Sequence, residues 1–311
     1  MSIEVIKAGM QTSVQDGGRP GYMHLGVAPG GAMDRLSMSL ANRLLGNSPT
    51  HPLLEICISG PVLRFTQSMS IAICGAQFEM WRVNQQGKFP LARNQSVTLQ
   101  AGDELHFAKR LVGARAYLAL AAQIDCPKVM ASLATHFQAG FGGLAGRALQ
   151  TGDVVPLRDC QVRPIKILPV AYQQSYSGKY LLRCCDAVES DLFSDSQRQT
   201  FYQQTYQLSH NSNRMGLRLT GEALPELAIA DMTSSGLLPG SIQVPPSGVP
   251  IIAGVDAQTI GGYPRIANII SADLFALAQL VPGDRLNFVH VNIKQAQAML
   301  RAQQKSLAVP F

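Results

Sequence analysis

Charged residues are scarce in this chain. Only 15% of its 311 residues are Asp, Glu, Lys or Arg, against about 25% in a typical soluble domain. Depletion of charge is typical of interface cores, so we expect a partner or a second copy to cover part of the surface. A turn-rich β protein with a polar, uncharged surface is the alternative. The formal net charge is +6, but the basic residues form no run and no stripe with aromatics, so we expect no nucleic-acid partner.

Signals for disulfides, metals and membranes are also missing. The six cysteines form no C-x-x-C pair, which argues against a disulfide framework or a zinc site and fits a reducing compartment. The histidines are dispersed, so no metal site is expected. No apolar run reaches about 18 residues, which excludes a transmembrane helix. The first residues lack the pattern of a signal peptide. We therefore expect a cytoplasmic protein without a membrane partner.

Common catalytic signatures are absent too. The chain has no G-x-x-x-x-G-K-[ST], no H-E-x-x-H and no G-x-S-x-G, so a P-loop, a zincin site and a nucleophile elbow are not expected. Residues 140–145 fit G-x-G-x-x-A formally, but they follow no convincing strand, which argues against a Rossmann site. No Met-Lys-Met-like sequence is present, so we expect no biotin attached to this chain.

Short strands dominate what is present. A frame L-x-x-G-D-x-[LV]-x-[FL] occurs at residues 99–107, 149–157 and 280–288, where Gly-Asp predicts a turn and the alternation after it a strand. Further strands are expected at Leu53–Ile58, Ser70–Cys74, Ser96–Leu99, Ala114–Ala121, Ile165–Val170, Tyr180–Cys184 and Arg285–Val291. Helices are expected at Met33–Leu45, where apolar residues have helical spacing, and more weakly at Glu189–Gln204, Ala272–Leu280 and Ile293–Gln304.

This pattern predicts a mainly β fold, a β-rich α+β protein with a few short helices. So few helices between so many strands argue against a doubly wound α/β fold. The length favours two domains. We place the boundary in Asp159–Pro164, which gives domains 1–163 and 164–311.

Four polar islands interrupt the strands. The first, QTSVQDGGRPGY, contains Gln15, Asp16, Arg19 and Tyr22 on a glycine-rich backbone and is followed by GAMD, which contains Asp34. A carboxylate in the first turn of a helix is favoured by the helix dipole even without a function. The second island, residues 142–149, places Arg147 after successive glycines. Such a segment can hold an oxyanion, or it is a tight turn in which the arginine pairs with a carboxylate.

The other two islands lie in the second half. Asn213 and Arg214 stand in NSNRMG, which is either a tight turn or a set of amide donors. The segment 240–264, GSIQVPPSGVPIIAGVDAQTIGGYP, combines prolines and glycines with polar groups, as a rigid loop facing a ligand or a pair of β-turns would. Its polar candidates are Gln243, Asp256, Gln258, Thr259 and Tyr263. No island holds a nucleophile–base pair, which favours electrostatic activation of an amide or carboxylate substrate.

The islands together resemble the KipA family, also named allophanate hydrolase subunit 2 or the C subunit of 5-oxoprolinase, which is related to the carboxyltransferase domain of urea carboxylase. The matching segments are QTSVQDGGRPGYMHLGV, GAMD, RAYLALA, FGGLAGRALQTGD, SNRMGLRLTG, SSGLLPGSIQVPPSGVPII, DAQTIGGYPRIA and DLFALAQLVPGD, in family order over most of the chain. One departure is Leu133, which stands where the family leads us to expect an arginine.

The resemblance implies two cyclophilin-like β-barrel halves and a smaller KipI-type partner, with a LamB/YcsF-type third subunit. It implies an ATP-dependent opening of 5-oxoproline to glutamate, with Mg²⁺ as an option at the level of the complex. A carboxyltransferase component of a biotin-dependent system and a non-catalytic protein that binds a KipI-type kinase inhibitor are the alternatives. On this interpretation Arg19, Arg147 and Arg214 bind anions, and Asp16, Asp34 and Asp256 transfer protons or orient a base. The remaining site candidates, which would hold the substrate, are Gln15, Tyr22, Asn213, Gln243, Gln258, Thr259 and Tyr263.

Overall fold

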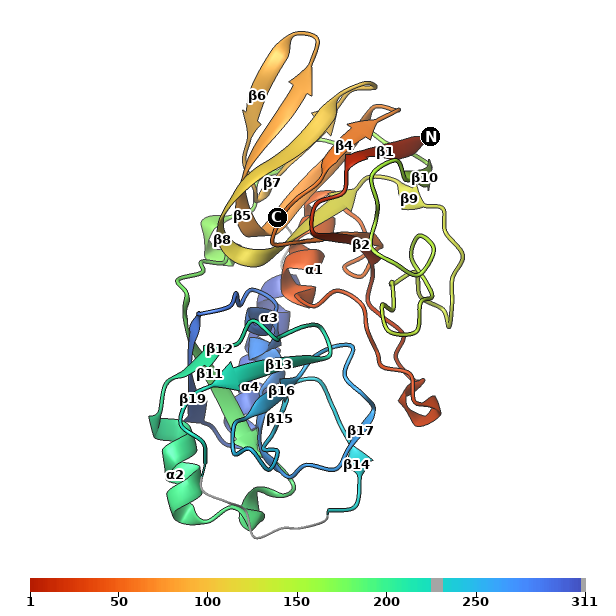
Figure 1. Cartoon of the computed structure of the whole chain (residues 1–311). Coiled ribbons are helices and arrows are strands. Elements are labelled where there is room, and N and C mark those ends of the chain that lie inside the picture. The colour runs from red at the N-terminus through yellow and green to blue at the C-terminus, as the bar shows by residue number, and fades with distance from the viewer. Residues whose placement is uncertain (225–231, 309–311) are drawn as a thin grey trace. The chain divides into compact units, whose positions relative to one another are not determined.

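The computed structural model describes residues 1–224 and 232–308 (Figure 1). Contacts between Cα atoms divide the chain into two compact units. Unit 1 contains Met1–Arg19 and Gly30–Tyr176, and unit 2 contains Pro20–Pro29 together with residues 177–308. The mainly β fold predicted from the sequence is confirmed.

Unit 1 is an open, half-barrel sheet of ten antiparallel strands. Its main path runs β2-β3-β8-β4-β1-β10-β9, and β5 joins it by pairing with β6, β7 and β8. The strands are β1 Ser2–Lys7, β2 Gln11–Gln15, β3 Leu53–Cys57, β4 Val62–Phe65, β5 Met69–Asn84, β6 Gly87–Leu91, β7 Gln95–Leu99, β8 Glu104–Leu120, β9 Gln123–Ile124 and β10 Val154–Arg158. The two longest strands, β5 and β8, lie side by side (Figure 1). Helix α1, Arg35–Leu44, packs on both of them.

Unit 2 is a closed barrel. Its strand order is β11-β18-β15-β16-β13-β12-β19, and the parallel pairing of β11 with β19 closes the ring, so these strands leave no open edge. The barrel strands are β11 Lys179–Asp186, β12 Tyr206–Leu208, β13 Gly216–Thr220, β15 Ser241–Gln243, β16 Ile251–Ala253, β18 Arg265–Ile269 and β19 Arg285–His290. The centres of the Phe201 and Phe288 rings stack at 4.7 Å and anchor helix α2, Asp195–Gln203, to the barrel.

The shorter elements complete both units. Two strands, β14 and β17, form a separate ribbon. These elements are β14 Ser235–Gly236, β17 Ile260–Gly261, α2 Asp195–Gln203, α3 Leu274–Leu277, α4 Ile293–Ala308, η1 Met23–Leu25, η2 Val170–Tyr172, η3 Ser190–Leu192 and η4 Ser271–Asp273. The helix expected at Met33–Leu45 is α1. The three weaker expectations overlap η3 with α2, η4 with α3, and α4, which runs four residues beyond the expected end.

The strand expected at Ile165–Val170 is wrong. Residues 165–169 are irregular apart from one bridge between Ile167 and Gln95, and Val170 begins η2. Pro164 precedes this segment and Pro169 lies within it, and a proline cannot donate to a strand ladder. The segment still runs beside β7, because the Ser96 amide donates to the Lys166 carbonyl at 2.8 Å. The boundary placed between residues 163 and 164 therefore falls inside unit 1, whose contacts extend to Tyr176.

The three Gly-Asp repeats are the same turn. Gly102, Gly152 and Gly283 have φ values of 88°, 91° and 90°, as the third position of a type II turn requires. In each turn the aspartate carboxylate accepts from the backbone amide three residues earlier, at 2.7, 2.7 and 2.9 Å. Each glycine amide also donates to a neighbouring strand: to Phe65, Val5 and Leu208 in turn. The turn therefore joins two strands at a fixed register.

We predict that Gly283→Ala destabilises unit 2 by about 1–2 kcal/mol, because a Cβ at positive φ is strained. No atom lies within 4 Å of the added Cβ, so the loss reports backbone strain alone. Urea unfolding followed by NMR at β12 and β19 measures it. Gly236→Ala is the matched control: its site is equally open but its φ is not in the left-handed region, and it should lose no stability. Equal losses in both variants would contradict the turn assignment.

Candidate functional site

Asp16 lies at the end of β2 and fixes a loop of unit 1. Its carboxylate accepts from the Gly18 amide at 2.8 Å, the Ser132 hydroxyl at 2.6 Å and the Leu133 amide at 2.7 Å. The carboxylate is buried, and these donors occupy both oxygens. Leu133, which stands where an arginine was expected, packs into the hydrophobic core of unit 1. These hydrogen bonds give Asp16 a structural role in fixing residues 132–134. Its role in proton transfer stays a prediction.

Gln15 and Arg19 are buried beside the same loop. The Gln15 amide nitrogen donates to the Ser13 hydroxyl at 3.1 Å and the Thr135 carbonyl at 3.3 Å. The Arg19 guanidinium donates to the Ala134 carbonyl and lies 4.9 Å from the centre of the Phe141 ring. The glycines of residues 140–146 make room for this packing, since a Cβ at Gly142 would lie 2.2 Å from the Ala134 carbonyl oxygen. The first and second islands thus meet in unit 1, around an arginine that is 1% exposed.

Asp34 is the N-cap of α1. Its carboxylate accepts from the amide and the hydroxyl of Ser37, at 2.8 and 2.6 Å. Its own amide donates to the Tyr117 hydroxyl at 2.7 Å, which in turn donates to Glu55 at 2.9 Å. Burial and the nearby Glu55 carboxylate raise the pKa of the Tyr117 hydroxyl well above its usual value. This buried network was missed from the sequence, although Glu55 is a lone charge in the otherwise apolar strand LLEIC.

Arg147 is paired. Its guanidinium makes two parallel hydrogen bonds to Asp153, at 2.7 and 2.9 Å, and Asp153 is the aspartate of the second Gly-Asp turn. The hydrogen bonds from Arg147 hold the pKa of the Asp153 carboxyl below its usual value. Of the two interpretations of this island, the structure shows the tight turn with a carboxylate partner.

Two predicted site residues of unit 2 also pair with each other. Arg214 donates to Asp256 from Nε at 2.7 Å and from Nη2 at 3.2 Å, and both side chains are nine-tenths or more buried. The Asp256 amide donates to the Arg214 carbonyl at 3.0 Å. A Cβ at Gly254 would lie 2.0 Å from that carbonyl oxygen, so this close approach needs glycine. Beside the pair, the Asn213 carboxamide oxygen accepts from the Met215 amide at 2.8 Å, which forms the tight turn.

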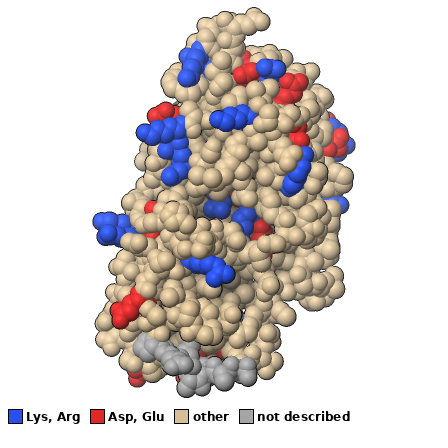
Figure 2. Space-filling model, in the orientation of Figure 1, with Lys and Arg blue, Asp and Glu red and all other residues tan. Residues whose placement is uncertain are grey.

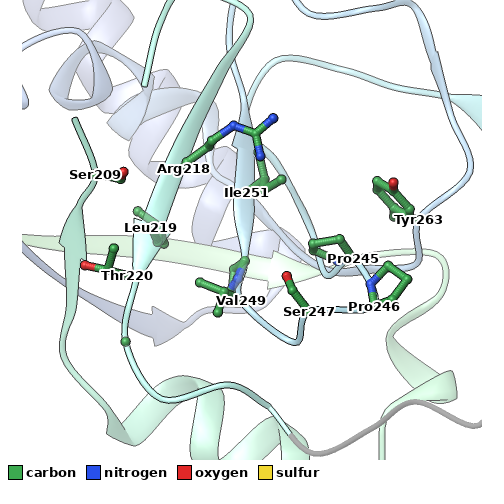
Figure 3. Close-up of a pocket in the computed structure, with 12 residues that line it drawn as sticks. Ser209, Arg218, Leu219, Thr220, Pro245, Pro246, Ser247, Val249, Ile251 and Tyr263 are labelled. Carbon is green, nitrogen blue, oxygen red and sulfur yellow. The ribbon is translucent and has the colours of Figure 1, made fainter. Parts of the chain in front are cut away.

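The segment 240–264 forms the wall of a pocket in unit 2 (Figure 3). The pocket has a volume of about 550 Å³. Its lining consists of Ser209, Arg218, Leu219, Thr220, Gly221, Pro245, Pro246, Ser247, Val249, Pro250, Ile251 and Tyr263. Tyr263 is the one predicted site residue among them. Arg218 was missed, although the alternation Leu217-Arg218-Leu219 places it on the outer face of a strand whose leucines are buried.

Other candidates support or flank this wall. The Gln243 amide nitrogen donates to the Tyr263 carbonyl at 3.1 Å, and Gly261 packs against the Gln243 carboxamide. The Thr259 carbonyl accepts from the Leu237 amide at 2.8 Å. Gln258 is exposed. Tyr22 lies at the start of η1, where its carbonyl accepts from the Leu25 amide at 3.0 Å.

Arg265 at the start of β18 pairs with Glu189 and also donates hydrogen bonds to strand β14 of the ribbon. Arg265 donates to both oxygens of Glu189 and to the Ser235 hydroxyl. The hydrogen bonds from Arg265 hold the pKa of the Glu189 carboxyl below its usual value. Arg265 directly follows Pro264, so this pair anchors the end of the pocket segment.

Charge is dispersed on the face that Figure 2 shows, where Lys and Arg side chains alternate with Asp, Glu and uncharged residues. Among residues 1–224 and 232–308, no three His, Cys, Asp or Glu side chains lie close enough to hold a metal ion. Within the same residues, no helix has the length and apolar character needed to cross a membrane.

Three comparisons relate the chain to known proteins. The family model described as carboxyltransferase domain, subdomain A and B, matches residues 25–290. A protein of Escherichia coli (strain K12), named as the C subunit of 5-oxoprolinase, is 37% identical over 97% of this chain and 96% of its own length. The protein of the same name from Haemophilus influenzae is 34% identical over 97% and 95%.

The crystal structure of the urea amidolyase from K. lactis superposes with a TM-score of 0.90 at 29% identity. That match covers 98% of this chain but 20% of the amidolyase chain, so the present chain spans about a fifth of that protein.

We predict that Asp256→Ala destabilises unit 2 by about 3–5 kcal/mol, because it leaves the Arg214 charge buried without its carboxylate. NMR-detected urea unfolding of β13 and β16 measures the loss. Asp195→Ala is the control: it removes an exposed ion pair with Arg198 and should cost below about 1 kcal/mol. A loss for Asp256→Ala no larger than the control would mean that the pair does not hold these strands.

We predict that acid loosens the ribbon and β18. A carboxyl whose pKa is lowered by folding stabilises the fold above its unfolded pKa, about 4.3 for Glu, and that contribution disappears as pH falls through the lower folded pKa. The stability of β18, measured by NMR-detected unfolding, should therefore fall below about pH 4. Glu189→Gln should flatten this dependence of stability on pH. Glu222→Gln removes an exposed carboxylate of unit 2 that has no ion pair among the described residues, and serves as the control. An unchanged slope in Glu189→Gln would refute the assignment.

Proposed function

Because the chain belongs to the carboxyltransferase domain family, subdomain A and B, we propose that it is a subunit of an ATP-dependent 5-oxoprolinase. The observation that supports this most directly is the match over nearly the full length of two proteins named as the C subunit of 5-oxoprolinase, covering 96% and 95% of them. The urea amidolyase of Lachancea kluyveri, at 31% identity, shares only 18% of its length with this chain.

The proposed reaction opens the lactam of 5-oxoproline with ATP and water to give glutamate, ADP and phosphate. We propose that the whole enzyme also contains a KipI-type subunit and a LamB/YcsF-type subunit. Opening a lactam develops negative charge on the carbonyl oxygen, and fixed hydrogen-bond donors around that oxygen lower the barrier by several kcal/mol. The contribution that we assign to this chain is to bind and orient the amide substrate.

The nucleotide is proposed for the complex and not for the glycine loop of this chain. The amides of Gly140, Gly143 and Gly146 donate to carbonyls of the same unit, at 2.9, 2.8 and 2.8 Å. Amides engaged in this way do not form a phosphate cradle, and Arg147 beside them is paired with Asp153. The proposal therefore assigns no ATP contact to this loop.

We expect ADP release that depends on 5-oxoproline when the chain is mixed with its KipI-type partner, the LamB/YcsF-type subunit, ATP and Mg²⁺. Coupled detection of ADP and chromatographic detection of glutamate measure it. Leaving out any one subunit is the control and should abolish glutamate formation. Glutamate formed at an unchanged rate without this chain, or no substrate-dependent ADP under any combination, would end the proposal.

Carboxyl transfer is the second candidate function. It is supported by the carboxyltransferase description of the family and by the structural similarity to the urea amidolyase of K. lactis. In that case a biotinylated carrier protein should bind this chain, and carboxybiotin should carboxylate an amide nitrogen in its presence. A pull-down with a biotinylated carrier, read alongside the ADP assay, separates the two candidates.

A further inference from the structure

Three hydrogen-bond donors without a described protein partner surround the pocket of unit 2. The Arg218 guanidinium, the Ser247 hydroxyl and the Tyr263 hydroxyl have no hydrogen bond or ion pair to residues 1–224 or 232–308. They come from β13 and from both ends of the Pro245–Tyr263 part of the wall, and their side chains lie around one open space (Figure 3). The other arginines discussed above are engaged by carboxylates or carbonyls. Arg218 therefore differs from them in having its donors available.

Among the residues that the structure describes, the pocket lining is mainly apolar and carries no negative charge. Its lining includes neither Asp nor Glu, so no residue of the wall neutralises the guanidinium. Pro245, Pro246, Val249 and Ile251 supply apolar surface next to the exposed Tyr263 ring, which is 46% accessible. An apolar wall with a few convergent polar groups is typical of small-molecule sites. Within the described lining, Arg218 is the cation at the edge of this wall, which matches a ligand that has one anionic group and a compact apolar body.

We propose that this pocket binds the carboxylate of a small cyclic acid, with Arg218 as the residue that recognises the carboxylate. The proposal rests on the proposed function and names the part of the substrate that this unit holds. A guanidinium pairs with a carboxylate through two parallel hydrogen bonds, a geometry that the ammonium of lysine cannot reproduce. Ser247 and Tyr263 supply further hydrogen-bond donors to the oxygens of the ligand. A nucleoside triphosphate fits poorly, because its several negative charges would meet a single cation.

The wall is rigid before any ligand arrives. Three prolines fix the backbone of residues 245–250, and Gly248 has φ 73°, where a Cβ would lie 2.5 Å from the Leu224 carbonyl oxygen. The Gly248 amide donates to the Pro245 carbonyl at 2.9 Å, which closes the turn. The hydrogen bond from Gln243 to the Tyr263 carbonyl holds the opposite side. Because the wall is already ordered, binding a small molecule costs little conformational entropy, which favours affinity.

Binding to the full chain tests the proposal. Isotope-detected NMR titrations would use 5-oxoproline, cyclopentanecarboxylate, the neutral lactam 2-pyrrolidone and ATP as probes. We expect both acids to shift signals of residues 245–251 saturably, and 2-pyrrolidone to bind at least about tenfold more weakly. Arg218→Gln should weaken the acids by about tenfold or more, as expected for loss of a charged hydrogen-bonded pair. Arg218→Lys should restore only part of this loss.

Arg285→Gln is the matched control, because Arg285 is an exposed strand arginine of the same barrel that does not line the pocket. Three results would overturn the proposal: equal binding of 2-pyrrolidone and 5-oxoproline, equal losses in Arg218→Gln and Arg285→Gln, or ATP as the only probe that shifts the pocket signals. In the assembled enzyme, Arg218→Gln should raise the KM for 5-oxoproline more than it lowers kcat. If the acids bind through Arg218 but the assembled enzyme makes no glutamate, the proposed function fails and the pocket assignment stands.

Discussion

Carboxylates that accept hydrogen bonds from backbone amides hold this β structure together at its turns. Asp103, Asp153 and Asp284 each close a Gly-Asp turn in this way. Asp16 and Asp34 do the same for a loop and for a helix start. A chain with few helices has many turns, and each turn leaves amides that need an acceptor. Much of the small supply of acidic residues is therefore used for architecture.

Local patterns predicted the elements well. The helical spacing of apolar residues at Met33–Leu45 and the Gly-Asp repeats depend on neighbours in sequence, and the structure has α1 and three matching type II turns at these positions. The strand predicted at Ile165–Val170 was wrong because Pro164 and Pro169 have no backbone N–H to donate to a strand ladder. The prediction rested on the apolar pattern, which does not take backbone donors into account. Closure of one sheet into a barrel depends on the pairing of β11 with β19, about a hundred residues apart, and local patterns do not encode it.

Side-chain partners were much harder to predict than elements. The sequence marks Arg214 and Asp256 as polar residues in glycine-rich segments, but it does not show that they neutralise each other across 42 positions. A residue's chemistry depends on how much of its hydrogen-bonding capacity the fold has already used. Arg19 and Arg147 are directed to a carbonyl and a carboxylate of their own unit. Arg218 is an exposed strand residue. Among the described residues, none accepts a hydrogen bond from its guanidinium, which lies beside the apolar wall of the pocket. The residue types of a glycine-rich loop therefore indicate where a site could lie. The hydrogen-bond partners of each side chain then decide whether that residue is structural or able to bind a ligand.

The residue types that line the pocket are suited to binding a substrate and not to reacting with it. The described residues of its lining include no carboxylate, imidazole, thiol or amine, so they supply no strong general base and no reactive nucleophile. A pocket of this kind can orient a substrate and recognise its charge, but the groups that transfer protons must come from outside it. Asp16, Asp34 and Asp256 already accept hydrogen bonds from groups of their own unit, and their role in proton transfer stays a prediction. On the proposed function, this barrel holds the substrate and other parts of the assembly supply the reacting groups, and the contacts described above are consistent with that division.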